Sequence, residues 1–322
     1  MLDRRALLGA LGLLATPALA QDAAPAEMPR AGKRDWASQI PTLRIGLLGG
    51  ENESDRLGRY DGYRKLLEQT FAVPVRLFPA ADYAGVIQAF GAKGIEMASM
   101  SGSSYAGAWL DTGGNVDPLV IPLEADGSTS YRSVLVVRQD SGITSLADMR
   151  GKSLAWADPN STSGYLIPRS ELRKSGIDAE PGKYFSRTGF GGGHEQAVVA
   201  VLQKQYDGAV TWASGIGERS EGYTRGNLRA MVDKGLLRMN DLAIVWTSAP
   251  ILNGPLVARK DTPQPFRDDM LAFHLALPTA HPAIYAAVER GGGKGYQRTR
   301  HEDFQVFIDL RREEAGQRRQ RG

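Results

Sequence analysis

The chain reads Asp158-Pro159-Asn160-Ser161-Thr162-Ser163-Gly164 between a strand-like apolar run at 152–156 and a helical pattern at 163–174. Amides in a first helical turn have no acceptor within the helix, and the helix dipole places partial positive charge there. Ser and Thr hydroxyls beside such a turn can wrap a phosphate-like oxyanion. The same residue types are also favoured helix N-caps, so the pattern alone leaves a plain cap open. The stretch therefore predicts a strand, a loop and a helix with a candidate anion cradle.

Strand and helix patterns alternate on both sides of this stretch. Short apolar runs at 43–48, 75–78 and 96–100 are separated by helical patterns, and the alternation resumes after residue 133. Such alternation predicts an α/β fold with mostly parallel sheets. The length of 322 residues exceeds a usual single domain, so we expect two lobes with separate cores. In open parallel sheets ligands bind beyond the carboxyl ends of the strands, which favours a cleft between the lobes.

The first twenty residues have the pattern of a secretory signal peptide. Arg4 and Arg5 precede the apolar run 6–14, and Ala18-Leu19-Ala20 fits a cleavage site. The run is shorter than the roughly 20 residues of a spanning helix, which favours export over a retained anchor. The paired arginines admit the twin-arginine route as well as the general one. Residues 21–41 are rich in Ala and Pro without an apolar period, so we expect a flexible leader there.

Charge and cysteine content exclude several classes of partner. The chain has 39 basic and 36 acidic residues and a net charge of +3, whereas nucleic-acid binding calls for a dense basic face. The one concentration of basic residues is at 311–322, which we expect to be a solvated, frayed C-terminal tail. Cysteine is absent from the sequence, which excludes disulfides and thiolate metal sites. We expect no nucleic-acid partner.

The motifs of common hydrolases and nucleotide enzymes are also missing. The chain lacks a Gly-x-Ser-x-Gly elbow and a Ser-x-x-Lys motif in a helical setting. His194-Glu195 lacks the second His of a zinc helix, and the glycine runs at 189–193 and 291–295 are not followed by Lys-Ser or Lys-Thr. We therefore predict a protein that is not an enzyme and that holds neither a metal nor a cofactor.

Four motifs resemble, in order and spacing, those of the phosphonate- and phosphite-binding proteins of ABC importers. They are Asp82-Tyr83-Ala84-Gly85, Asp126-Gly127 with Tyr131, the stretch 158–164, and Gly193-His194-Glu195. The likeness spans roughly residues 43–260. It implies a two-lobed periplasmic binding protein of type II, expected as a monomer, that closes on its ligand and delivers it to a permease in the inner membrane. The expected divisions are lobe 1 at 42–129 plus 247–310 and lobe 2 at 130–246.

The resemblance also assigns residues to the ligand. It implies that Ser161, Thr162 and Ser163, with the amides of their helix, hold the phosphonate oxygens together with His194. Tyr83 and Tyr131 match the cleft tyrosines of the family, although a single tyrosine is more often a packing residue. Ser104 and Tyr105 stand where family members often carry Gly-Pro and then Tyr, and they remain candidates. Glu51, after the first strand, is either a cleft residue or part of a solvated turn.

The organic end of the ligand is where this chain departs from its relatives. Relatives that bind 2-aminoethylphosphonate hold the ammonium with two carboxylates, and the corresponding positions here are Ser214 and Gly254. Neither residue pairs with a cation, so we expect an oxyanion without a required ammonium group: phosphite, a phosphate-like ion or a phosphonate with a neutral substituent. Two alternatives stay open. One is a binding protein of the same fold for a sulfonate or another small anion, and the other is a ligand-sensing subunit for a receptor or kinase.

Overall fold

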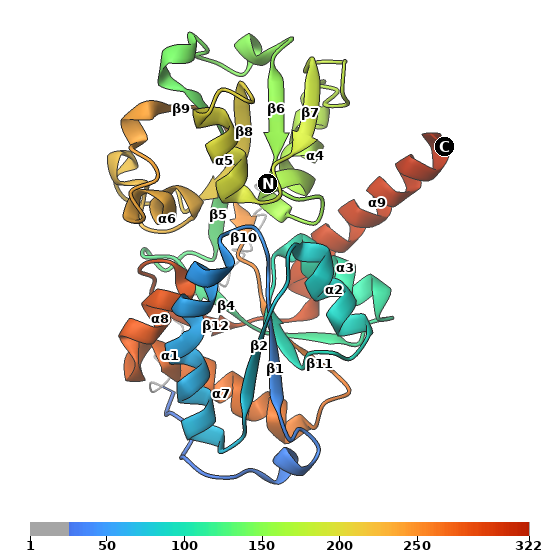
Figure 1. The fold of residues 1–322 in the computed structure, drawn as a ribbon. Helices are drawn as coiled ribbons and strands as arrows, with labels where there is room; N and C mark the ends of the chain where they lie inside the picture. The colour runs from blue at the N-terminus through green and yellow to red at the C-terminus, as the bar shows by residue number, and fades with distance from the viewer. Residues whose placement is uncertain (1–25, 322) are drawn as a thin grey trace, which may run out of the picture.

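The computed structural model describes residues 26–321, which form two lobes stacked one above the other (Figure 1). Each lobe is built on one sheet with helices packed against it. The predicted two-lobed α/β architecture is confirmed. The predicted signal peptide, residues 1–20, lies outside the described residues.

Lobe 1 contains a six-stranded sheet in the order β12-β4-β11-β3-β1-β2. Its strands are β1 (Leu43–Leu47), β2 (Val75–Pro79), β3 (Met97–Ser99), β4 (Val116–Leu123), β11 (Leu256–Arg259) and β12 (Gly295–Arg298). Strand β1 is parallel to β2 and β3, whereas β11 is antiparallel to its neighbours β3 and β4, and β12 to β4. A side chain at Gly46 of β1 would come within 2.6 Å of Ile95, so glycine at this position allows Ile95 to pack closely against the strand.

Helices on the two faces of this sheet enclose separate apolar cores. One face is covered by α1 (Glu53–Phe71), α7 (Gln264–Ala280) and α8 (Pro282–Glu289), and the other by α2 (Tyr83–Gly91), α3 (Gly102–Asp111) and α9 (Gln305–Arg321). The side chains of Phe71 and Phe273 are fully buried in the first core, and those of Phe90 and Phe304 in the second. Within residues 26–321, no single helix has the length and apolar character to cross a membrane, although α7 and α8, bent by 108°, meet both conditions as a pair.

Lobe 2 contains a second sheet, in the order β10-β5-β8-β6-β7, with β9 also paired to β5. Its strands are β5 (Ser130–Arg138), β6 (Ser153–Trp156), β7 (Arg187–Phe190), β8 (Gly208–Ala213), β9 (Leu242–Thr247) and β10 (Ile251–Leu252). Its helices are α4 (Ile167–Lys174), α5 (His194–Leu202) and α6 (Asn227–Asp233), and a π-helical turn, η4 (Thr162–Leu166), precedes α4. Strand β5 is antiparallel to β8, β9 and β10, so the sheet is mixed and less parallel than the sequence pattern indicated.

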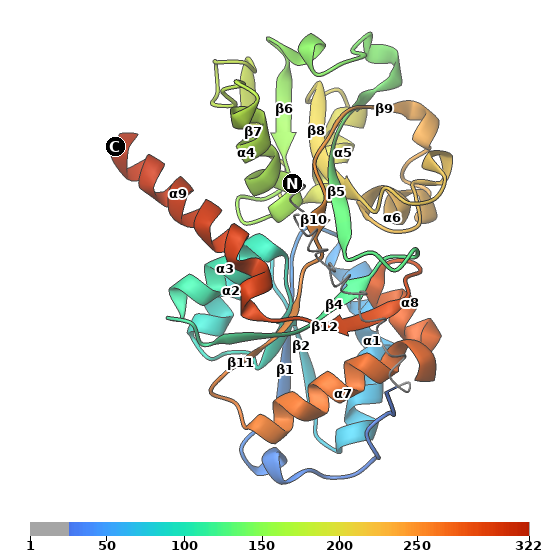
Figure 2. The same cartoon turned by 180° about the vertical axis from the view of Figure 1, so that it is seen from behind.

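The chain crosses between the lobes twice. It passes from β4 to β5 through residues 124–129 and returns from β10 to β11 through residues 253–255. The second crossing lies beyond the boundary expected at residue 247, because β10 still pairs with β5 in lobe 2. Both crossings lie next to each other at the waist of the molecule (Figures 1 and 2). Two adjacent connections of this kind allow one lobe to rotate against the other.

The end of the predicted flexible leader is ordered, which corrects that prediction. Residues Asp35–Ser38 form a 3-10 turn, and Trp36 is buried against Phe71 and Phe266, with ring centroids 5.8 and 5.1 Å apart. Its indole Nε1 donates a hydrogen bond of 2.7 Å to Asp269. The order of this segment depends on one buried aromatic side chain. A single side chain produces no apolar period, so the sequence pattern did not predict it.

The predicted frayed tail is also wrong, because residues up to Arg321 continue α9. Figure 2 shows α9 leaving lobe 1 beside α3 and running alongside lobe 2. Arg169 and Arg173 of α4 form ion pairs with Glu314 and Glu313, at 2.7 and 2.8 Å. These ion pairs with lobe 2 stabilise the helix, and the sequence of the tail alone does not reveal them.

Candidate functional site

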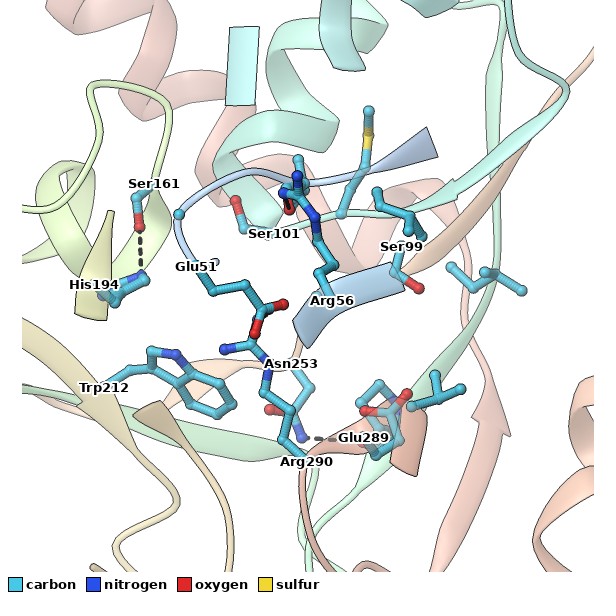
Figure 3. Close-up of a pocket in the computed structure, with 18 of the residues that line it drawn as sticks. Glu51, Arg56, Ser99, Ser101, Ser161, His194, Trp212, Asn253, Glu289 and Arg290 are labelled. Atoms are coloured by element: carbon cyan, nitrogen blue, oxygen red, sulfur yellow. Dashed lines mark hydrogen bonds and ion pairs between the residues drawn. The ribbon is translucent and has the colours of Figure 1, made fainter. Parts of the chain in front are cut away.

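A cavity of about 190 Å³ lies where the two lobes meet. Its lining comes from the ends of β1 and β3, the start of β5, the first half of α1, the start of α2, the turn before α4, the start of α5 and the end of α8. Of the predicted site residues, Ser161, Ser163, His194, Tyr83, Tyr131 and Glu51 line this cavity. The structure thus brings together residues from both lobes that are more than one hundred positions apart in the sequence (Figure 3).

The turn at 161–166 is the candidate anion cradle predicted from the sequence. Ser161 is its N-cap, and the Ser161 hydroxyl accepts a hydrogen bond of 3.0 Å from the amide of Gly164. The amide of Leu166 bonds to the carbonyl of Ser161 at 3.1 Å, which opens the turn into a π-helix before α4 begins. Any side chain at Gly164 would collide with Ala157 and His194. The first-turn amides of Thr162 and Ser163 have no acceptor within the helix and are available to an oxyanion.

His194 stands at the first position of α5 and faces Ser161. Its Nε2 lies 3.0 Å from the Ser161 hydroxyl, and its Nδ1 lies 3.5 Å from the hydroxyl of Thr211. Thr211 also accepts a hydrogen bond from Asn227 and can still donate its own proton to Nδ1, which is compatible with an imidazole proton on Nε2. Burial, reinforced by the charge of Arg290, lowers the pKa of His194 to about 3, so the ring is neutral at pH 7.

Tyr83 and Tyr131 bring phenol groups to the same turn. Both side chains are buried, and burial raises the pKa of Tyr83 and raises that of Tyr131 to about 12. Hydrogen-bonding interactions with Ser161 and Ser163, respectively, oppose those shifts and show that each hydroxyl lies close to the cradle. Tyr131 also packs edge-on against Trp212 at 5.4 Å between ring centroids. Both phenols therefore stay protonated at neutral pH, and each is able to donate a hydrogen bond without a charge.

Glu51 is a buried cleft residue rather than part of a solvated turn. It forms ion pairs with Arg59 and with Arg290, the latter at 2.7 Å, and lies 3.9 Å from Lys234 of lobe 2. Burial opposes ionisation of Glu51, but the charges of Arg290, Arg59 and Lys234 outweigh it and lower the pKa of this carboxyl. The residue is therefore an anion surrounded by cations.

Four predicted residues do not line the cavity. The hydroxyl of Thr162 turns to lobe 1, where it accepts a hydrogen bond of 2.7 Å from the amide of Ser103. Ser104 completes a capping box with Ser101, and Tyr105 is buried in the core of lobe 1 with its hydroxyl 2.8 Å from His301. Ser214 bonds to Thr224 at 3.0 Å. Packing between elements that are distant in the sequence determines the direction of these side chains. The spacing of residues in the sequence does not predict that packing.

The arginines of the cavity were not predicted from the sequence. Arg56 and Arg59 reach it from α1, Arg225 from the loop before α6, and Arg290 from the end of α8. Trp212 and Asn253 complete the group of polar and aromatic side chains that line the cavity. One weak sequence pattern pointed to two of these arginines. Arg56 and Arg59 lie three residues apart, on the same side of a predicted helix that follows Glu51.

Two sheet-based lobes around a polar interlobe cavity define the class of two-lobed solute-binding proteins. The chain belongs to the family of periplasmic substrate-binding proteins of phosphonate ABC transporters, whose model matches residues 45–304. The resemblance inferred from the four motifs is thereby confirmed.

Individual relatives agree with this family. The chain is 29% identical over 227 residues to a phosphate-import protein, PhnD, of Mycolicibacterium smegmatis, covering 68% of this chain and 66% of that protein. It is 29% identical over 259 residues to the phosphonates-binding periplasmic protein of Escherichia coli, covering 79% and 71%.

Solved structures show the same fold. A binding-protein component of an ABC phosphonate transporter from Pseudomonas aeruginosa superposes with a TM-score of 0.72 at 24% identity, covering 84% of this chain and 85% of that one. PhnD1 from Prochlorococcus marinus, solved with methylphosphonate, superposes with a TM-score of 0.70 at 18% identity, covering 85% and 98%.

Proposed function

We propose that this protein captures a phosphonate, phosphite or related phosphorus oxyanion in the interlobe cavity and delivers it to a membrane permease. The observation that carries the proposal is the convergence of donors at one point. Ser161, Ser163, the open amides of their turn and Nε2 of His194 come from lobe 2, and the phenol of Tyr83 comes from lobe 1. Several neutral donors arranged around one point match a tetrahedral oxyanion.

The relatives support the same ligand class. They include a phosphate-import protein and a phosphonates-binding protein by name, and a probable phosphite-binding protein of Prochlorococcus marinus matches 178 residues at 25% identity. A transporter component of this family works in the periplasm. We extend to this chain the export by residues 1–20 and the action as a monomer that the sequence analysis predicted.

An ammonium group on the ligand is disfavoured. A side chain at Gly254 would lie 2.0 Å from the carbonyl oxygen of Met100, so this backbone admits no carboxylate there, and Ser214 lies outside the cavity. The two acids that line the cavity already have cationic partners: Glu51 pairs with Arg59 and Arg290, and Glu289 pairs with Arg225. A ligand ammonium would have to compete with these guanidinium groups.

The protonation state of His194 favours binding over catalysis. Ser161 and His194 are hydrogen-bonded like a nucleophile and its base, but a histidine whose pKa is lowered to about 3 is a weak base at neutral pH. Its Nδ1 faces the hydroxyl of Thr211, where a catalytic triad would place a carboxylate. We infer that the pair orients donors toward an anion and does not attack it.

Calorimetric titration of the mature protein at pH 7 tests this function. The ligands are phosphite, methylphosphonate, phosphate, 2-aminoethylphosphonate, sulfate and taurine. We expect phosphorus oxyanions to bind, and 2-aminoethylphosphonate to bind less tightly than methylphosphonate. Exclusive binding of sulfate or taurine would move the protein to the sulfonate and sulfate class.

A matched pair of serine substitutions tests the site itself. Ser163→Ala removes a hydroxyl from the cradle and should weaken binding by about 1.5–3 kcal/mol, the usual range for a hydrogen bond to a charged group. Ser170→Ala is the control, because Ser170 lies on the following helix with a buried hydroxyl that has no partner within the described residues and does not line the cavity. Equal affinity of the two variants would contradict the assignment of the cradle.

A further inference from the structure

The part of the cavity lined by α1 and α8 is basic. Arg56 and Arg59 project from α1, and Arg290 follows the last residue of α8. We call these three side chains the basic wall. Figure 3 shows Arg290 pointing toward Glu51, in the space between Trp212 and Arg56.

The basic wall has more positive charge than its protein partners balance. Glu51 is the carboxylate that pairs with both Arg59 and Arg290. Arg56 forms no ion pair among residues 26–321; it donates to the carbonyls of Leu48 and Ala80, and its Nε is buried without a hydrogen-bond partner. Three guanidinium groups therefore face one carboxylate.

Arg225 lines another part of the same cavity, and its positive charge is balanced by neighbouring carboxylates. It pairs with Glu124 through two nitrogens, with Glu289 at 3.0 Å, and with the side-chain oxygen of Asn253 at 3.2 Å. Because two carboxylates surround Arg225, its charge is fully compensated by the protein. The excess of positive charge is thus specific to the basic wall.

Arg290 is also held in a costly backbone conformation. It caps the C-terminal end of α8 with φ 57° and ψ 49°, a left-handed geometry that costs a residue with a side chain about 1–2 kcal/mol. Glycine is the usual residue there, and Gly291 follows directly. Five residues other than glycine have positive φ in the described chain, and Arg290 is the one that lines the cavity. Strain kept at a ligand cleft points to a function for the side chain.

The donors of Arg290 are largely unused. Only Nη2 donates to Glu51, whereas Nε and Nη1 have no hydrogen-bond partner within the part of the chain that the structure describes. Arg290 is close enough to the cradle that its charge contributes to the low pKa of His194. The cavity of about 190 Å³ is several times the roughly 30 Å³ that one water molecule occupies, so it has room for a ligand longer than phosphite.

We propose that the ligand is a phosphonate whose organic substituent ends in a carboxylate, and that Arg290, supported by Arg59, binds this carboxylate while the cradle holds the phosphonate group. This inference rests on the proposed function and names the substrate class of the same site. A guanidinium donates along the edges Nε/Nη2 and Nη1/Nη2, and Arg290 uses only Nη2, for Glu51. Its Nη1 is therefore free to donate to a ligand carboxylate, which a guanidinium binds through charge-assisted hydrogen bonds. The second negative charge of the ligand would offset the excess charge of the basic wall.

Competition between three matched ligands tests the proposal in the unmodified mature protein. Phosphonoacetate carries the carboxylate, its amide has the same shape without the charge, and methylphosphonate lacks the group. We expect phosphonoacetate to bind at least about tenfold more tightly than the other two. Equal affinity of all three would overturn the carboxylate assignment but leave the proposed function intact. Failure of every phosphorus ligand to bind would instead refute the proposed function.

Substitution of Arg290 locates the effect. Arg290→Gln should remove the preference for phosphonoacetate over its amide, with Arg59→Gln as a second variant should the first fail to fold. The control is Arg238→Gln, the same change at a side chain that is 85% exposed on lobe 2, and it should keep the preference. An Arg290→Gln protein that loses affinity equally for all three ligands would show that Arg290 serves the phosphonate group, which would overturn the proposal.

Discussion

His194 and His274 are buried in different lobes and are both held neutral. Nδ1 of His274, in α7, lies 2.6 Å from the carbonyl oxygen of Met270, so Nδ1 carries the proton and donates it. Nε2 of the neutral ring accepts a hydrogen bond of 2.8 Å from the hydroxyl of Tyr63. Burial lowers its pKa to about 4, although the bond to Met270 opposes the shift. Protonation of either ring would place an uncompensated charge in the interior.

This predicts a loss of stability in mild acid. Unfolded histidine titrates near pH 6.5, so between pH 6.5 and 4 the unfolded chain binds protons that the folded chain does not. The free energy of unfolding should therefore fall as the pH is lowered from 7 to 5, by up to about 1.4 kcal/mol per pH unit for each histidine. Urea denaturation at several pH values measures this, and His274→Gln should reduce the slope by up to one histidine's share. A variant with an unchanged slope would show that the pKa of His274 is not lowered in the folded protein.

At the residue scale, the sequence identified side chains whose direction follows from their place on one element. Ser161, Ser163 and His194 were predictable because they stand at helix starts, where orphan amides and short polar side chains face the same way. Tyr105 stands beside another helix start, but α9 covers it and His301 takes its hydroxyl. Arg290 was missed because its orientation depends on a left-handed cap at the end of α8.

At the scale of elements, α9 is where pattern and structure differ most. Phe304, Phe307 and Ile308 pack in the core of lobe 1 at and just before the start of α9. Beyond them the sequence has no apolar stripe that would predict a helix. The acids Glu313 and Glu314 instead face α4 of lobe 2, and Arg311 donates to the side-chain oxygen of Asn160 at 3.0 Å. The strands β4 and β12 were also absent from the sequence-based prediction, and they pair at the edge of lobe 1.

The contacts between α9 and α4 should favour the closed arrangement. They join a helix anchored in lobe 1 to a helix of lobe 2, so opening the lobes breaks them. The double change Glu313→Gln and Glu314→Gln should lower the affinity for ligand about two- to thirtyfold, since partly exposed ion pairs each contribute about 0.2–1 kcal/mol. Calorimetry with the best ligand of the panel measures it, with Glu302→Gln, 70% exposed, as the control. Unchanged affinity would mean that α9 follows lobe 2 during opening.

At the scale of the whole molecule, the cavity is closed by polar contacts between the lobes. Asp158 of lobe 2 accepts from the amide of Tyr83 at 3.3 Å, and Thr162 accepts from the amide of Ser103. A buried ion-pair cluster joins Arg225 of lobe 2 to Glu124, which follows β4, and to Glu289. Burial disfavours the charge of Arg225, but the bond to Glu124 and the charges of both acids raise its pKa, so it stays ionised.

Removing the charge of Arg225 should open the lobes more than it unfolds them. A buried carboxylate left without its partner costs about 3–5 kcal/mol while it stays buried. Glu124 lies beside a crossing between the lobes, so opening returns it to water and avoids most of that cost. Arg225→Gln should therefore increase the radius of gyration of the ligand-free protein in solution scattering and weaken ligand binding at least about tenfold, with a smaller effect on thermal unfolding.

Two further variants make this test specific. Arg229→Gln is the matched control, because Arg229 pairs with Asp233 inside lobe 2 and should change neither the radius nor the affinity. Adding Glu124→Gln to Arg225→Gln removes the stranded carboxylate and should recover part of the closed population, since two neutral amides can hydrogen-bond to each other. An Arg225→Gln protein as compact as the parent, with the same affinity, would show that closure depends on the cradle side of the cavity alone.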